Sequence, residues 1–341
     1  MHTLLEGVVL AELGCILYGL VILDKCLTLS DINKAICLLW GKITIEKTHK
    51  PAEIFKIQEP GHVLAPSMKA VQWWALLKYL PMAVGKIVSL KNKNWKFLLH
   101  LSHLIDLIFA PCFTHEMIVY MKHVISDHLF MFSKLYCNNE VRLRPKHHFL
   151  VHLPNIITKS GPLVGMSCMP YELKNSFFKR CAHIVCNFTN ICHTLAHRHQ
   201  RQALESQLSN KRIHKIITVS CEEIAIAKTL HAGSVEYKQG HFIAINIDKE
   251  TGLPNFGKIV CFISTANNQI NMNRGEEWYF VLEIVKTNNF TYHLHSYEVI
   301  FLCQLEYQIF KFSNFFDYHP LYCLLETTEK KHFVRLPYHV F

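Results

Sequence analysis

The fold is decided by two short stretches, HFIAINID at residues 241–248 and WYFVLEIV at residues 278–285. Both are rich in β-branched and aromatic side chains, a composition that favours strands. Turn residues occur between and after them, at Thr251-Gly252, Phe256-Gly257 and Asn288-Asn289. Short strands at this spacing predict a small antiparallel barrel or curled sheet over residues 216–341.

Residues 1–210 follow a helical period instead. Apolar residues recur on one face at Met117, Met121, Val124, Ile125, Phe132 and Leu135. Ser30-Asp31 is expected to cap an earlier helix that buries Ile32, Ala35, Leu38 and Leu39. Pro66-Ser67 is expected to open a helix that Pro81 kinks or ends. Four or five such helices packed together would bury these faces.

The predicted fold class is therefore α+β, a helical bundle followed by a small antiparallel β-barrel-like domain. The predicted domains are 1–210, mainly helical, and 216–341, rich in strands. A linker is expected around Ser209-Asn210-Lys211-Arg212.

Composition narrows the class of protein. Half of the residues are hydrophobic and 18% are charged, which is typical of a globular chain. The thirteen cysteines contain no CxxC pair, which favours reduced thiols and an intracellular location. Residues 8–23 are strongly apolar but include Glu12, and we interpret them as a buried core helix with no membrane contact.

The charge is uneven along the chain. Residues 1–214 hold 25 Lys and Arg against 13 Asp and Glu, whereas the remaining 127 residues hold 11 against 13. A basic first part suggests that any contact with a polyanion lies there. An ordinary basic surface explains the charge equally well.

Histidine and cysteine give no defined site from their spacing. His148 and His152 lie four residues apart, as do His193 and His197, and three cysteines lie near the second pair, Cys181, Cys186 and Cys192. This spacing matches no standard zinc pattern, so we predict core cysteines and surface histidines and no metal site from these residues. Glycine-rich phosphate loops, GxSxG and HExxH are absent, while a Cys–His pair for catalysis stays open.

Residues 142–200 resemble a known family. The first matching segment is Pro145, Lys146, His148, Phe149, Leu150, His152 and Pro154. The second comprises Gly161, Pro162, Leu163, Glu172, Lys174, Phe178, Lys179, Asn190, Thr194, Leu195, Ala196 and Gln200. Together with MHTLLEGV at residues 1–8, Trp73-Trp74, IFAP at residues 108–111 and FDYHPL at residues 316–321, they resemble eukaryotic transposases of the CACTA and Kyakuja-Dileera-Zisupton kind.

The resemblance implies an RNase H-like core in which three acidic side chains hold two Mg²⁺ ions that cleave and join DNA. Glu172 would be the third acid, and the helical stretch from about 8 to 140 would be an insertion. In the family, the first two acids precede or immediately adjoin the signature at which this chain starts. Thr3 replaces the Asp of that signature. Pro170 and Asn175 differ from the residues that the family has around the Glu that corresponds to Glu172. Glu172 is read equally well as an acid near a helix N-terminus.

We therefore expect a transposase-derived, catalytically inactive protein that binds no Mg²⁺ by itself and needs no small-molecule cofactor. Non-specific DNA contacts are expected from Arg142, Arg144, Lys146, Lys174, Lys179 and Arg180, with the nucleus as the place of action. Solvated helix faces are the alternative for these six residues. The alternative function is a non-enzymatic protein-interaction scaffold that uses an SH3-like β-module. Self-association is expected if the Glu172 helix lacks a packing partner.

Overall fold

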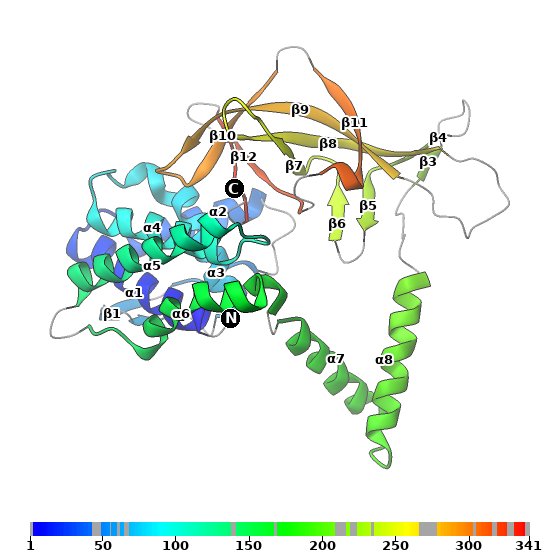
Figure 1. The fold of residues 1–341 in the computed structure, drawn as a ribbon, viewed down its shortest axis with the longest axis horizontal. Helices are drawn as coiled ribbons and strands as arrows, with labels where there is room; N and C mark the ends of the chain where they lie inside the picture. Colours follow the sequence, from blue (N-terminus) through cyan, green and yellow to red (C-terminus); the bar gives the residue numbers. More distant parts are fainter. Residues whose placement is uncertain are drawn as a thin grey trace. The chain divides into compact units, whose positions relative to one another are not determined.

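The computed structural model describes residues 3–42, 49–54, 56–59, 62–64, 68–137, 141–166, 169–208, 216–218, 224–232, 235–265, 278–302, 305–315, 319–325 and 331–337. The chain forms two compact units, shown with the element labels in Figure 1. Unit 1 contains Met1–Tyr171, Thr291–Ser296 and Leu336–Phe341, and unit 2 contains Glu172–Phe290 and Tyr297–Arg335. The predicted domains 1–210 and 216–341 stay a prediction, and the predicted linker lies outside the described residues.

Unit 1 is built mainly from helices. Its elements are η1 (Leu4–Val9), α1 (Leu10–Tyr18), η2 (Gly19–Leu23), α2 (Leu29–Lys42), β1 (Lys56–Glu59), β2 (His62–Leu64), α3 (Ala70–Val84), η4 (Gly85–Ile87), α4 (Lys93–Ile108), α5 (His115–Tyr136), α6 (Pro145–Ser160) and η5 (Leu163–Met166). The short strands β1 and β2 pair antiparallel. The core of the unit includes Leu5, Leu13, Ile16, Trp95 and Phe97, all with no exposed surface.

The N-terminal helical run is apolar enough to raise the question of a membrane. Leu4–Leu23 is long enough to span a bilayer and has a mean hydropathy of 2.0. However, 72% of this window is buried inside the fold. A buried core helix can be as long and as apolar as a membrane span. The burial of this run inside the fold is what a core helix requires.

Helix starts follow local capping chemistry. Asn92 caps α4 by accepting a hydrogen bond from Trp95 N, and Thr114 caps α5 by accepting one from Met117 N. At α2, Thr28 and Asp31 bond each other's backbone N–H groups, so the helix begins before the predicted Ser30-Asp31 cap. Leu38 is 69% exposed, so its predicted burial is wrong.

Pro81 neither ends nor breaks the helix in which it lies, because α3 continues to Val84. A proline removes the N–H that would bond the carbonyl four residues earlier. That carbonyl belongs to Leu77, and it accepts a hydrogen bond of 3.4 Å from the buried Ser102 hydroxyl of α4. A neighbouring helix therefore supplies the donor that proline lacks.

Residues 291–296, a turn distant in sequence, belong to unit 1 and are fixed there by two histidines. Trp95 Nε1 donates to His293 Nδ1 at 3.0 Å, and His293 Nε2 bonds the Gly85 carbonyl. His295 Nε2 lies 2.9 Å from Asp106 Oδ2, and both side chains are buried. Because His293 Nδ1 accepts, its Nε2 must carry the proton that it donates.

Unit 2 contains most of the strands. Its elements are α7 (Met169–Val185, from Glu172 on), α8 (Ile191–Leu208), β3 (Ile216–Thr218), β4 (Ile224–Ala227), β5 (Thr229–Ala232), β6 (Val235–Lys238), β7 (Phe242–Ile247), β8 (Pro254–Thr265), β9 (Trp278–Thr291), β10 (Ser296–Phe301), β11 (Tyr307–Lys311), η6 (Phe312–Asn314), β12 (Cys323–Leu325) and β13 (His332–Val334). The ends of β9 and β10 belong to the turn assigned to unit 1.

The main sheet is antiparallel and open. The strand order along its described path is β12-β13-β10-β9-β8-β4-β3, while β11 branches from β9 and β7 from β8. The prediction of an α+β protein with an antiparallel sheet is confirmed. The prediction of a barrel-like closure is wrong for the described strands, because β12 and β3 at the two ends of the path do not pair with each other.

The sheet has its own apolar core. Tyr237, Ile259, Phe262, Phe280 and Leu282 have no exposed surface and pack together with their neighbours. Phe262 and Phe280 meet edge to face with ring centroids 5.0 Å apart. The alternating burial along the first part of β9 explains why the period of two was visible in the sequence.

Candidate functional site

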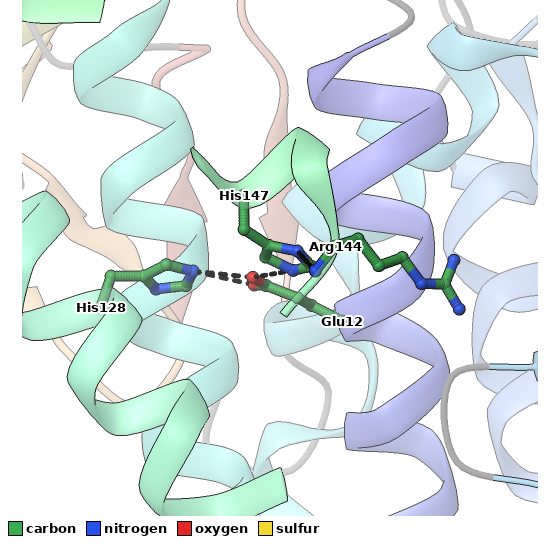
Figure 2. Close-up of polar contacts among 4 residues, drawn as sticks. All are labelled: Glu12, His128, Arg144 and His147. Carbon is green, nitrogen blue, oxygen red and sulfur yellow. Dashed lines mark hydrogen bonds and ion pairs between the residues drawn. The ribbon is translucent and has the colours of Figure 1, made fainter. Parts of the chain in front are cut away.

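The most unusual polar group of unit 1 is a carboxylate enclosed by two imidazoles. Glu12 comes from α1, His128 from α5 and His147 from α6, as Figure 2 shows. His128 Nε2 lies 3.0 Å from Glu12 Oε1 and 2.9 Å from Oε2. His147 Nε2 lies 3.3 Å from Oε1, a close polar contact that is poorly aligned for a hydrogen bond.

The protonation of His147 follows from its other nitrogen. The Arg144 backbone N–H donates to His147 Nδ1 at 3.0 Å, and His147 N–H donates to the Arg144 carbonyl at 2.9 Å. A ring nitrogen that accepts a hydrogen bond carries no proton, so the neutral ring carries its proton on Nε2, which faces Glu12. In Figure 2 the Arg144 side chain extends away from the carboxylate.

The three side chains are closed to solvent. The exposed fraction of the side chain is 0% for Glu12 and His128 and 2% for His147. Burial by itself raises the pKa of Glu12, but the two histidines outweigh it, so its pKa is lowered and the carboxylate is charged. The cluster therefore links α1, α5 and α6 inside unit 1.

The Glu12 cluster was missed by sequence reasoning as a site. The signal was present, because Glu12 is a charged residue in an otherwise apolar helix. A buried charge requires partners. The two histidines lie far along the chain, and no local pattern points to them.

Glu172, the predicted third acid, lies in the first turn of α7. Its side chain is outside the described residues, so its part in a metal site stays a prediction. Among the residues that the structure describes, no group of three or more His, Cys, Asp or Glu side chains is arranged to hold a metal ion. The family's Mg²⁺ chemistry likewise stays a prediction.

The six predicted DNA-contacting residues are divided between the two units. Arg142, Arg144 and Lys146 are exposed at the start of α6 in unit 1. Lys174, Lys179 and Arg180 lie on α7 in unit 2, where the last two are exposed. Lys174 has a structural role, because its Nζ donates to Gln202 Oε1 at 2.9 Å and lies 4.6 Å from the centre of the Phe177 ring.

The contact between Cys323 and His332 provides no activated thiol. Cys323 Sγ lies 3.6 Å from His332 Nδ1. Burial raises the pKa of Cys323 to about 12 and lowers that of His332. The thiol and the imidazole are therefore neutral, whereas a nucleophilic cysteine needs a thiolate. Of the three cysteines near the second histidine pair, Cys181 is buried and Cys186 and Cys192 are exposed.

A small apolar cavity of about 250 Å³ lies in unit 1. Its lining residues are Thr3, Leu4, Phe109, Phe149, Leu150, Leu153, Ile156, Leu163 and Met166. Thr3 is the only polar residue among them. Ligand sites combine apolar walls with several polar groups that fix orientation, so this cavity defines no chemistry.

Comparisons with known proteins add no assignment. The chain matches no protein-family model, no curated protein and no solved structure.

Proposed function

We propose that this chain is a transposase-derived protein that binds DNA without cleaving it. In this proposal the helical part corresponds to the insertion and last helix of an RNase H-like catalytic domain, and the strands form an attached β-module. The motif between residues 142 and 200 supports the relationship. One candidate acid cannot assemble a two-metal centre, which supports the absence of cleavage.

The observation that carries DNA binding is the concentration of positive charge in one part of the sequence. Residues 141–208 contain nine Lys and Arg against two Glu, a balance of +7 within a chain whose net charge is +10. The same stretch contains seven histidines. A backbone of phosphates is the polyanion that such a surface would attract.

In unit 2, this basic stretch forms the two helices α7 and α8. Lys179 and Arg180 are exposed on α7, and Arg198 and Arg201 are exposed on α8. The contact from Lys174 to Gln202 joins the two helices. Exposed side chains of this kind contact phosphates and give little sequence specificity.

A salt series tests the proposal. We expect the full chain to bind a fluorescent duplex DNA with an affinity that falls steeply as salt rises, because each phosphate contact releases a counterion. Lys179→Glu with Arg180→Glu should weaken binding at least about tenfold and lower the salt slope by about 2. Lys91→Glu with Lys93→Glu is the matched control, since it makes the same change in charge on exposed residues of unit 1.

The DNA proposal fails if the full chain does not bind, if its binding does not depend on salt, or if both double variants weaken binding equally. The last result would indicate attraction by net charge alone.

Cleavage is tested separately. We expect no nuclease or strand-transfer activity with Mg²⁺ or Mn²⁺. Metal-dependent activity that Glu172→Gln abolishes would overturn the proposal of an inactive chain. Activity that Glu172→Gln leaves intact would indicate a contaminant.

A second candidate function is a protein-interaction scaffold, and β11 favours it. This strand pairs with β9, and its Tyr307 and Ile309 are 52% and 61% exposed. An apolar edge strand can accept an added strand from a partner. DNA binding that is absent or independent of salt, together with a bound protein lost on Ile309→Lys, would favour this function over the first.

A further inference from the structure

The rings of two histidines on α6 are turned so that one nitrogen of each approaches the other. His148 and His152 are exposed one turn apart. Their Nε2 atoms lie 3.1 Å from each other, and their rings are nearly perpendicular, at 85°. Both nitrogens therefore face the same small region beside the helix.

The separation of 3.1 Å fits coordination of one metal ion. Bonds of about 2.05 Å from zinc to two imidazole nitrogens place the nitrogens roughly 3.3 Å apart at a tetrahedral angle. The same bonds place them about 2.9 Å apart at a right angle. The observed separation lies between these values, so both rings could bind with only a small movement.

We propose that His148 and His152 form a two-imidazole site for a divalent transition-metal ion such as Ni²⁺, Zn²⁺ or Cu²⁺. Neutral imidazole suits these ions, whereas Mg²⁺ prefers oxygen ligands. The remaining positions are filled by water, because both side chains are exposed. This site does not depend on the proposed DNA binding or on Glu172.

The other explanation of the short separation is a hydrogen bond in which one Nε2–H donates to the other nitrogen. Such a bond would hold the same geometry without any metal. The two explanations differ in their response to added metal, and this difference makes the proposal testable.

The chain offers a matched comparison on α8. His193 and His197 have the same spacing and are exposed, but their rings are nearly parallel, at 20°, with centroids 6.5 Å apart. At least one ring must rotate before both nitrogens can meet one ion. Removal of one of these histidines should therefore affect the tightest metal binding much less.

Ni²⁺ is the suitable probe because exposed thiols compete more strongly for Zn²⁺. We would measure Ni²⁺ affinity of the full chain by competition with a chromophoric chelator, with Mg²⁺ in excess. His148→Ala and His152→Ala should each weaken the tightest site at least about tenfold, because chelation makes the second bond intramolecular. His193→Ala should leave it within about twofold.

Thermal unfolding gives an independent readout and checks folding. Ni²⁺ should raise the unfolding temperature of the wild type and of His193→Ala, because it binds the folded helix preferentially. The rise should be lost in His148→Ala, whose metal-free transition should remain cooperative. Equal Ni²⁺ affinity in the wild type and His148→Ala, or equal loss in His148→Ala and His193→Ala, would overturn the proposal.

Discussion

At the scale of single residues, the Glu12 carboxylate shows how unit 1 accommodates a charge in its interior. A charged carboxylate removed from water loses several kcal/mol of solvation. His128 and His147 replace part of that solvation, and His128 also stacks on Phe97 with ring centroids 4.9 Å apart. The stability of the buried Glu12 charge therefore depends on both histidines.

The first prediction concerns Glu12→Gln. An amide at this position loses the charge. Its oxygen can still accept a hydrogen bond, but its single NH2 group faces an imidazole Nε2 where the wild-type carboxylate presents an acceptor. We expect the free energy of unfolding to fall by about 3 kcal/mol, as for other broken buried pairs, measured by urea denaturation. Glu116→Gln on the exposed start of α5 is the control and should leave the free energy of unfolding close to that of the wild type.

Acid should also lower the free energy of unfolding, because it protonates the Glu12 carboxylate. Because its pKa is lowered in the folded protein, the charged carboxylate contributes stability above its ordinary pKa of 4.5. That contribution is lost as pH falls through the lower folded value. An unfolding free energy that is the same in Glu12→Gln and the wild type at neutral pH would contradict this role.

The second prediction concerns His241 in unit 2. Burial, with help from Lys238, lowers its pKa from 6.5 to about 4. Its Nδ1 accepts a hydrogen bond of 3.0 Å from Lys238 N–H, which protonation would break. The unfolded chain therefore binds the proton more readily, and stability is complete above pH 6.5 and lost as pH falls toward 4.

Comparison with His241→Phe isolates this effect from the other histidines. The wild type should lose about 2 kcal/mol relative to the variant between pH 6.5 and 4, after allowance for partial solvent access. Parallel curves for the wild type and His241→Phe would show that His241 titrates normally.

At the scale of elements, residues 291–296 belong to unit 1 although they lie far along the chain from its helices. His293 accepts from Trp95 and donates to the Gly85 carbonyl, so it satisfies a donor on one element and an acceptor on another. Leu294 of the same turn is 6% exposed. An alanine Cβ at Gly85 would lie 2.8 Å from Leu294 Cδ2, which explains the need for glycine there.

The third prediction concerns His293→Ala. The variant leaves the Trp95 N–H and the Gly85 carbonyl without this partner, and each such loss costs roughly 1–3 kcal/mol when buried. We expect a total loss of about 2 kcal/mol together with a change in the fluorescence of Trp95 before unfolding. Tyr292→Ala, at a position 77% exposed, should produce neither change.

Some helices and strands could be predicted from the sequence, and others could not. The helix α5 was predicted because the apolar periodicity from Met117 to Leu135 is a local feature. The continuation of α3 past Pro81 was not predicted, because the compensating donor is Ser102 on another helix. The open sheet was missed because pairing between distant strands leaves no local pattern.

The candidate site was predicted even less completely. Of the six basic residues, Lys174 is engaged with Gln202, which its charge could not reveal. The convergence of His148 and His152 is a property of ring orientation and not of spacing. Glu12 was noticed as an acid in an apolar run, but its two partners required the tertiary structure.

At the scale of the whole molecule, exposed apolar side chains bear on association. Ile184, Phe188 and Leu204 of the α7–α8 region are 74%, 66% and 58% exposed. Scattered apolar residues are ordinary, but several in one region favour contacts between molecules. This region also carries the exposed Lys179, Arg180, Arg198 and Arg201.

The fourth prediction is concentration-dependent self-association of the full chain, measured by sedimentation velocity. Ile184→Gln with Phe188→Gln should shift the chain toward the monomer, because both substitutions remove apolar contact area. Leu90→Gln, at a position 61% exposed in unit 1, should not. A monodisperse wild-type monomer at all concentrations would contradict the expectation of a helix that lacks its packing partner.

Arg144 contributes to the interior through its main chain. Its amide hydrogen holds the His147 ring, while its exposed guanidinium extends away from Glu12 (Figure 2). In a scan of every substitution at this position, the fold should accept any residue that keeps the amide hydrogen and reject proline. Folding then allows the residue at position 144 to vary between related sequences. If related sequences keep one type of side chain there, the reason would be binding and not folding.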